Sequence, residues 1–246
     1  MRITKNILLV FVFLFFGGLY GSHLPPKKED KRGKGIRLGF GPAVGFYTIN
    51  ENHTKGVNPK IGAIVSFRKE TRFARDYRTF FLWGVDYMIH GLTFQSYYFA
   101  KDSLKLYNKK FTYRYALYVQ EINVPFQMKY SLRRENNSLY SPYFMIGYHL
   151  RYLLPGNLKV TQNGEDIVID KPTMKFKNFL GSQQLNAFLS ASFGWQKNNT
   201  SNTKTGFFVE INYRYGFTPY YFQTDYSASS LFINSSHLAL QLGLKF

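Results

Sequence analysis

Acidic and basic side chains recur at positions that alternate with apolar residues along several segments of the chain. Carboxylates beside cations can form ion pairs, relay protons or act as general acids and bases. The eight charged residues with this spacing are Arg37, Asp86, Glu121, Lys129, Arg151, Glu210, Arg214 and Lys245. Because alternate residues of a strand share a face, we expect these side chains to meet in a network of salt bridges that supports the fold. A proton or ion path and a binding or active site are the alternatives.

Histidine and serine offer a second kind of chemistry. None of the five histidines is spaced from another as in a metal site; they are His23, His53, His90, His149 and His237. His90 and Ser96 could pair as base and nucleophile in a lipid-modifying hydrolase, although only their proximity in sequence favours this. The chain has no cysteine and no phosphate-binding or nucleotide motif. We therefore expect no catalytic residues, no metal and no cofactor, and a protein that is not an enzyme.

Eight segments carry the alternation that would position these side chains, with one apolar and one polar face each. They are residues 36–47, 59–68, 79–90, 117–131, 141–152, 184–196, 205–216 and 237–246. Each segment is long enough to cross a bilayer as a tilted strand. The pattern predicts an all-β fold, an eight-stranded antiparallel up-and-down transmembrane β-barrel with long extracellular loops. The charged face would line its interior, which eight strands leave just wide enough for side chains to fill.

The connections between these segments alternate between long and short, as they do in outer-membrane barrels. The outward links are 48–58, 91–116, 153–183 and 217–235, and the inward links are 69–78, 132–140 and 197–204. Within the third outward link, Asn163-Gly164 separates two β-prone runs, which predicts a small hairpin. This parity places both termini in the periplasm.

The first residues are typical of an export signal. Arg2 and Lys5 precede an apolar run over residues 7–16, which is shorter than a membrane-spanning helix requires. We expect a signal peptide over residues 1–21, with an uncleaved anchor as the alternative, then a basic periplasmic segment over 22–35 and the barrel over 36–246. The formal net charge of +18 favours acidic lipid head groups or an acidic protein as partner, because an exported chain rarely meets nucleic acid.

Aromatic residues make up 19% of the chain, while its mean hydropathy is only −0.27. This combination suits a transmembrane barrel, in which apolar outward residues alternate with polar inward ones. The chain ends on Phe246, the last apolar residue of an alternating strand. We expect this terminal aromatic residue to serve as the assembly signal that the barrel-assembly machinery reads.

Four stretches resemble the PorT-like outer-membrane β-barrel family of Gram-negative bacteria. They are GVDYMIHGLTFQSYYF (84–99), QEINVPFQMKYSL (120–132), YSPYFMIGYHLRYLL (140–154) and the terminal HLALQLGLKF (237–246). The resemblance implies an exported eight-stranded barrel in the outer membrane. The family's named member is part of the type IX protein secretion apparatus, and the family has no catalytic signature to transfer.

We therefore expect a non-enzymatic barrel that acts as a structural or accessory component of an envelope complex, with protein secretion as one such process. A lipid-modifying enzyme and a barrel that binds a small ligand are the alternatives. The expected partners are outer-membrane lipid and lipopolysaccharide, the barrel-assembly machinery and another envelope protein. The candidate partner-binding residues, which combine aromatic rings with cations in outward links, are Tyr97, Tyr98, Phe99, Lys109, Lys110, Lys175 and Lys177. They could instead pack on each other over the barrel mouth.

Overall fold

The protein forms one closed antiparallel β-sheet within the unit Arg32–Phe246. The computed structural model describes residues 34–49, 54–72, 78–101, 108–133, 140–162, 165–167, 173–176, 185–197, 205–217, 219–223 and 231–246. The predicted signal peptide over residues 1–21 lies outside the described residues, as does nearly all of the basic segment. The first strand begins at Lys34, two residues inside the predicted basic segment.

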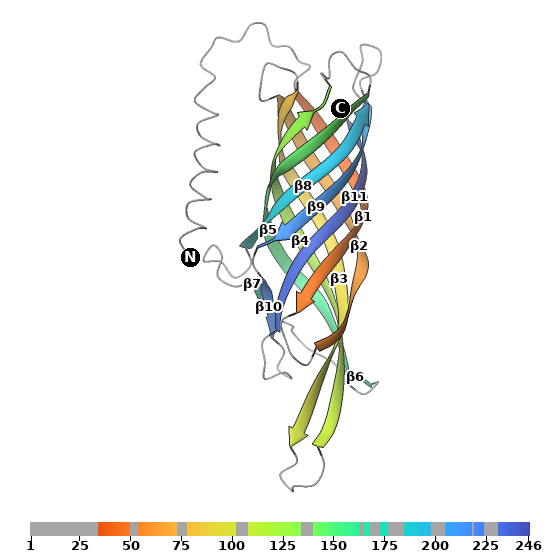
Figure 1. Cartoon of the computed structure of the whole chain (residues 1–246), viewed down its shortest axis with the longest axis vertical. Helices are drawn as coiled ribbons and strands as arrows, with labels where there is room; N and C mark the ends of the chain where they lie inside the picture. Colours follow the sequence, from red (N-terminus) through yellow and green to blue (C-terminus); the bar gives the residue numbers. More distant parts are fainter. Residues whose placement is uncertain are drawn as a thin grey trace. The chain divides into compact units, whose positions relative to one another are not determined.

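Eight long strands form the wall of the barrel (Figure 1). They are β1 (Lys34–Ile49), β2 (Thr54–Arg72), β3 (Thr79–Lys101), β4 (Asn108–Ser131), β5 (Tyr140–Gln162), β8 (Leu185–Lys197), β9 (Gly206–Gly216) and β11 (Leu231–Lys245). Each strand pairs antiparallel with the next in this series, and β11 pairs with β1 to close the circle. The predicted eight-stranded antiparallel barrel is confirmed.

Closure brings the two ends of the barrel sequence together. Arg37 is in register with Lys245 and Val44 with Leu238. The backbone N–H of Ile36 donates to the carbonyl of Phe246 at 3.1 Å, and the N–H of Phe246 donates to the carbonyl of Ile36 at 2.9 Å. The terminal residue thus completes the last rung of the ladder, so neither strand is left with an open edge there. Its use as an assembly signal stays a prediction.

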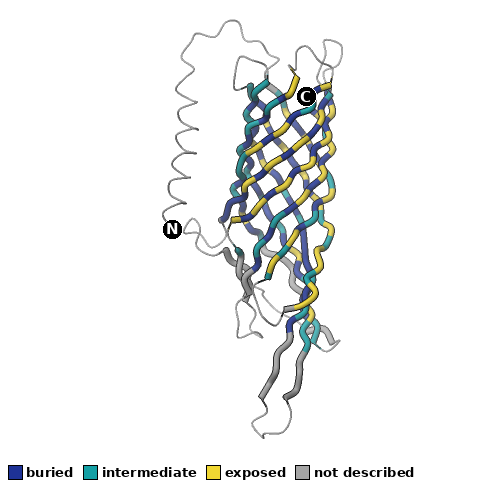
Figure 2. Tube along the Cα trace, viewed as in Figure 1, coloured by how far each residue is buried: buried dark blue, intermediate teal, exposed yellow. Residues whose placement is uncertain are grey.

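Buried and exposed residues alternate along the strands (Figure 2). In β9 the alternation is unbroken from Gly206 to Gly216. The outward residues are large and apolar, as shown by Ile61 at 78% exposure and Phe40 at 64%. A surface of this kind suits lipid rather than water. The described residues include no helix that is long and apolar enough to span a membrane.

From Tyr118 toward the tip of the β3–β4 hairpin, the wall reverses which of its faces is apolar. The outward residues become polar, with Thr93, Gln95 and Arg114, whereas Phe94 and Tyr115 on the inner face are 1% exposed. The strands β3 and β4 continue as a paired hairpin to Lys101 and Asn108 (Figure 1), where the sequence predicted a link over residues 91–116. Only residues 102–107 separate the two strands, so that prediction was wrong.

Short strands occupy part of the other predicted links. β6 (Glu165–Ile167) pairs with β5, with Gln162 opposite Glu165, so the hairpin predicted around Asn163-Gly164 is confirmed. β7 (Thr173–Phe176) pairs with β10 (Tyr220–Gln223), which in turn pairs with β11. The inward link 69–78 is also shorter than predicted, because β2 continues to Arg72.

Candidate functional site

The charged residues that the sequence singled out lie together in the barrel interior. Their exposed fractions range from 0% to 8%, and the residues are Arg37, Asp86, Glu121, Lys129, Arg151, Glu210, Arg214 and Lys245. Two further charged residues on β2, Arg68 and Glu70, are 1% exposed and join the same network. Sequence reasoning ended the second segment at residue 68, which left Glu70 in a link. It did not place Arg68 on the polar face, although Ser66, Arg68 and Glu70 continue the alternation.

The first cluster gathers three cations around Glu70. The Nζ atoms of Lys129 and Lys245 donate to Oε1 of Glu70 at 2.8 and 2.6 Å, and Arg37 donates to Oε2 at 3.3 Å. Arg37 also donates to the hydroxyl of Tyr143 at 2.5 Å. Its guanidinium lies 4.0 Å from the centre of the Phe208 ring. One carboxylate therefore holds three neighbouring strands and β4 in register.

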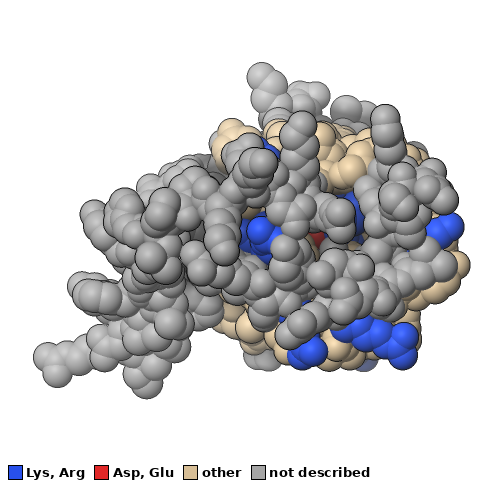
Figure 3. Space-filling view, turned by 90° about the horizontal axis from the view of Figure 1, so that it is seen from above, with Lys and Arg blue, Asp and Glu red and all other residues tan. Residues whose placement is uncertain are grey.

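This cluster lies at the end of the barrel where the chain terminates. Figure 3 looks along the barrel from that end, and Lys and Arg atoms surround a small acidic area near its centre. Lys245 is 8% exposed there, whereas Lys129 behind it is fully buried. The mouth at this end is therefore occupied by paired charges.

The second cluster is centred on Asp86. Arg68 binds both carboxylate oxygens, through Nε at 3.0 Å and Nη2 at 2.9 Å, and Arg214 binds Oδ2 at 2.6 Å. Arg68 also donates to Glu210 at 3.2 Å, and Glu210 accepts from Tyr143 at 3.1 Å. Glu210 therefore connects the second cluster to the first. Bidentate pairs of this geometry are the strong form of a buried ion pair.

The third cluster is a chain from Tyr47 to Arg151. The hydroxyl of Tyr47 and Nδ1 of His90 are 2.5 Å apart, and Nε2 of His90 lies 3.2 Å from Glu121. Nε of Arg151 lies 2.7 Å from the same carboxylate. The ring of His237 packs on His90 with centroids 4.3 Å apart. A hydroxyl, an imidazole and a carboxylate in series could move a proton, which makes this cluster the part of the interior closest to chemistry.

The pairing of His90 with Ser96 that the sequence raised is not formed. Both nitrogens of His90 are engaged by Tyr47 and Glu121. Ser96 is fully buried, and its Oγ has no hydrogen-bond partner among the described residues. Nor are any three described His, Asp or Glu side chains placed to hold a metal ion.

The interior turns apolar next to the third cluster. The residues of this apolar plug are at most 2% exposed; they are Leu92, Phe94, Tyr115, Leu117, Val119, Leu153, Val160 and Ile233. Tyr47 and Ile49 pack against it from β1. The rings of Phe94 and Tyr115 are stacked with centroids 4.8 Å apart. The interior thus passes from clusters of ion pairs to an apolar core.

The candidate partner-binding residues are distributed over three elements. Tyr97, Tyr98 and Phe99 lie on β3, with Tyr98 opposite Phe111 and Phe99 opposite Lys110. Lys109 and Lys110 lie on β4 and Lys175 on β7, opposite Tyr221. The side chains of these residues, and Lys177 altogether, lie outside the described part of the chain. Their role in binding a partner stays a prediction.

The chain is similar to one protein family and to several solved structures. The family model described as "Outer membrane protein beta-barrel domain" matches residues 28–221. Among solved structures, OprG from Pseudomonas aeruginosa is 16% identical, with a TM-score of 0.49 over 88% of this chain and 97% of that chain. Neisserial surface protein A (NspA) is 13% identical, with a TM-score of 0.41 over 86% and 95%. Ail of Yersinia pestis is 16% identical, with a TM-score of 0.32 over 87% and 99%. No curated protein matches the chain at a significant level.

Proposed function

Since the chain belongs to the outer membrane protein beta-barrel domain family, we propose that it is a non-enzymatic barrel that serves as a structural or accessory component of an envelope complex. The observation that carries this proposal is the filling of the interior. Charged groups around Glu70 and Asp86 engage each other, and the apolar plug follows them along the axis. A barrel filled in this way offers its ends, rather than its lumen, to other molecules.

The hairpin of β3 and β4 supports an interaction at one end. Its strands stay paired up to Lys101 and Asn108, beyond the level at which the outer surface stops being apolar. A rigid two-stranded projection can present side chains to a partner at low entropic cost. Another envelope protein is the partner we propose, with the aromatic and basic residues from Tyr97 to Lys110 as its contact.

The finer assignment follows from the resemblance to PorT-like proteins. On that basis the chain would be exported by its signal peptide, would insert with both termini in the periplasm, and would assist protein secretion. Lipopolysaccharide and the barrel-assembly machinery would be further partners. A lipid-modifying enzyme is less well supported, because His90 engages Tyr47 and Glu121 and leaves Ser96 aside.

Shortening the hairpin tests the proposal. Tyr97 is paired with Thr112, so replacing residues 98–111 with an Asn-Gly turn leaves a complete rung and a closable hairpin. We expect this variant to fold, as judged by heat-modifiable gel mobility, and to lose the partner that co-purifies with the intact protein. The control variant replaces residues 198–204, in the link at the opposite end, with the same two-residue Asn-Gly turn. Full complementation of a deletion strain by the shortened hairpin would overturn the proposal.

Conductance tests the closed lumen. Purified protein in planar bilayers should give no steady, well-defined channel, because the interior is occupied by side chains. Reproducible large conductance that disappears on heat denaturation would contradict a structural role and favour transport.

A further inference from the structure

The outer wall is interrupted by a β-bulge in β2. Lys55 is opposite Gln95 and Asn58 is opposite Thr93, so two residues of β2 face the single residue Phe94 of β3. Gly56, the first of the two, has a φ of +64°, a conformation that side-chain-bearing residues rarely adopt. The Nδ2 of Asn58 donates to the carbonyl of Gly56 at 3.1 Å. Bulges with glycine in this conformation bend a strand and re-aim neighbouring side chains.

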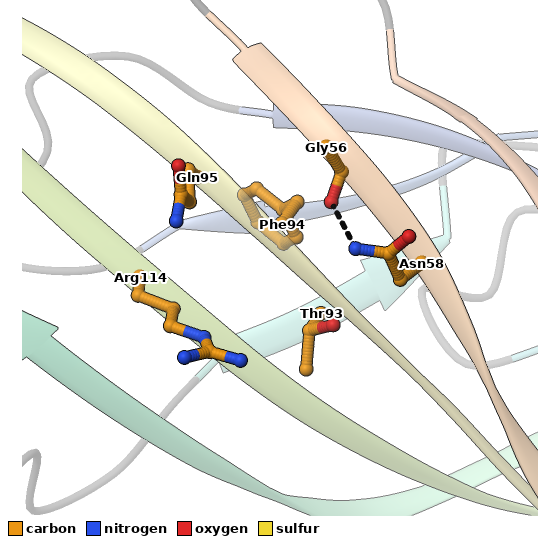
Figure 4. Close-up of a pocket in the computed structure, with 6 residues that line it drawn as sticks. All are labelled: Gly56, Asn58, Thr93, Phe94, Gln95 and Arg114. Atoms are coloured by element: carbon orange, nitrogen blue, oxygen red, sulfur yellow. Dashed lines mark hydrogen bonds between the residues drawn. The ribbon is translucent and has the colours of Figure 1, made fainter.

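A notch of about 200 Å³ lies at this bulge, between β2, β3 and β4 (Figure 4). We call this cavity the rim notch. The six residues that line it are Gly56, Asn58, Thr93, Phe94, Gln95 and Arg114. Phe94 belongs to the buried plug and is 1% exposed, whereas Arg114 is exposed. The lining combines one guanidinium, two amides and one hydroxyl, and it contains no carboxylate. These groups together are donors suited to an oxyanion.

Further cations surround the rim notch on the outward face. Lys55 is in register with Gln95, and Gln95 with Arg114, so the two cations share one row across the strands. Lys159 is opposite Ala116, two residues along β4 from Arg114. No hydrogen bond or ion pair joins the guanidinium of Arg114 to another described residue. A phosphate in the notch would therefore meet a guanidinium that has no competing anion among those residues.

The height of the rim notch restricts what can reach it. Tyr118 and Lys60 mark the edge of the apolar surface on the side of the β3–β4 hairpin, where the Lys60 Nζ donates to the Tyr118 hydroxyl at 2.7 Å. Arg114 lies four residues from Tyr118 on β4, toward the tip of the hairpin. This is about 13 Å along a strand, or about 10 Å along the axis of a barrel with strands tilted by about 40°. Head groups extend only about 5–8 Å beyond the hydrocarbon core on each side. The phosphate of an ordinary phospholipid would therefore lie closer to the bilayer centre than the rim notch.

We propose that the rim notch binds a phosphate group carried on the sugar head group of a glycolipid in the surrounding leaflet. Arg114 engages the phosphate through its planar fork, and Thr93 and Gln95 contribute neutral donors. Lys55 and Lys159 add positive potential on either side. This inference deepens the lipopolysaccharide contact of the proposed function and rests on it in that respect. It does not depend on the envelope partner, because Arg114 lies outside residues 98–111 and stays in the shortened variant.

Titration of the folded full chain in zwitterionic detergent tests the proposal. The probes are phosphorylated lipopolysaccharide, the same lipopolysaccharide after dephosphorylation, phosphatidylcholine and inorganic phosphate. We expect only the phosphorylated glycolipid to bind, about tenfold more weakly to Arg114→Gln and with an intermediate loss for Arg114→Lys, which keeps the charge but not the fork. The matched control is Lys69→Gln, which removes an exposed cation of β2 near the opposite end. Heat-modifiable mobility confirms that each variant is folded.

Three results would overturn the proposal. Equal binding by Arg114→Gln and Lys69→Gln would show that overall charge, and not the rim notch, attracts the lipid. Competition by millimolar inorganic phosphate would identify the notch as a site for a free anion. Binding of phosphatidylcholine as tight as that of lipopolysaccharide would remove the requirement for a sugar-borne phosphate. Loss of the envelope partner in the shortened hairpin would leave glycolipid binding unchanged, so the two proposals fail separately.

Discussion

The two ends of the barrel interior are equally buried but are stabilised by different forces. Around Glu70 and Asp86, guanidinium and ammonium groups neutralise carboxylates at 2.6–3.3 Å. In the apolar plug, Leu117, Phe94 and their neighbours pack as in the core of a soluble protein. Ion pairs are directional and leave a costly charge if one partner is lost, whereas apolar packing loses only the contacts that are removed. The charged end should therefore be sensitive to charge and the apolar end to volume.

The difference also follows the surroundings of the wall. Where lipid covers the outside, as at Ile61 and Phe40, the polar residues of each strand have only the interior to occupy. Where the wall leaves the apolar band, Thr93 and Arg114 face outward and the interior receives the apolar residues. A single alternating strand thus builds both regions, and the point of inversion marks the edge of the apolar surface.

Loss of the Glu70 charge should have the largest effect. Glu70→Gln keeps the side-chain shape but leaves Lys129 and Lys245 without their shared carboxylate, at a cost of about 4 kcal/mol. Urea unfolding from lipid vesicles, followed by tryptophan fluorescence, measures this loss. Gln196→Ala is the control, because it removes a neutral acceptor of the same Lys129 ammonium at 3.0 Å. It should cost about 1 kcal/mol. Similar losses for the two variants would contradict a charge-dependent cluster.

A cavity in the apolar plug should have the next largest effect. Leu117 is fully buried, so Leu117→Ala should lower the free energy of unfolding by about 3 kcal/mol through lost contacts and an unfilled cavity. Leu117→Met conserves volume and should cost less than about 1.5 kcal/mol. The same unfolding measurement compares them. If both substitutions are equally damaging, shape and not apolar volume governs this end.

A double-mutant cycle separates pairing from simple loss of a side chain in the charged end. Asp86→Asn leaves Arg214 unpaired at a site where it is fully buried, and Arg214→Met removes that unpaired charge. The double variant should recover about 2 kcal/mol relative to the sum of the two single losses. Strict additivity would mean that Asp86 and Arg214 are not coupled, and that the Glu210 carboxylate, which pairs with Arg68, already supplies the negative charge that the site needs.

The sequence predicted the membrane-embedded wall well because a single period governs it. Outward apolar and inward charged residues alternate through Asp86 and Arg214, and the structure places both inside. Arg68 and Glu70 escaped notice because Lys69, the outward residue between them, is also charged. The alternation of apolar and polar residues is therefore hidden there, and three charged residues in a row are typical of a turn. The hairpin beyond Thr93 escaped because the apolar residues at its base, Phe94 and Tyr115, face inward. A search for outward apolar rows cannot detect a strand in which the surroundings have reversed the pattern.

The contacts within the interior were beyond the sequence for another reason. Glu70 on β2 meets Lys129 on β4 and Lys245 on β11, residues 59 and 175 positions away. Periodicity fixes the face of each residue but not its height, which depends on the register between strands. The rim notch was likewise invisible, because it depends on the positive φ of Gly56 and on a one-residue shift between β2 and β3.

The smallest expected effect lies where the two regions meet, at His237. Its ring is fully buried and contacts the rings of His90, Phe188 and Tyr47, and neither of its nitrogens has a hydrogen-bond partner among the described residues. A buried polar group without partners is unfavourable, whereas an aromatic ring of similar size keeps the packing. His237→Phe should therefore leave the stability unchanged or raise it by less than about 1 kcal/mol. His90→Phe is the matched control, and it should be clearly destabilising because it removes the link between Tyr47 and Glu121. If His237→Phe destabilises as much as the control, the ring is bound through water, and the charged region extends to the edge of the apolar plug.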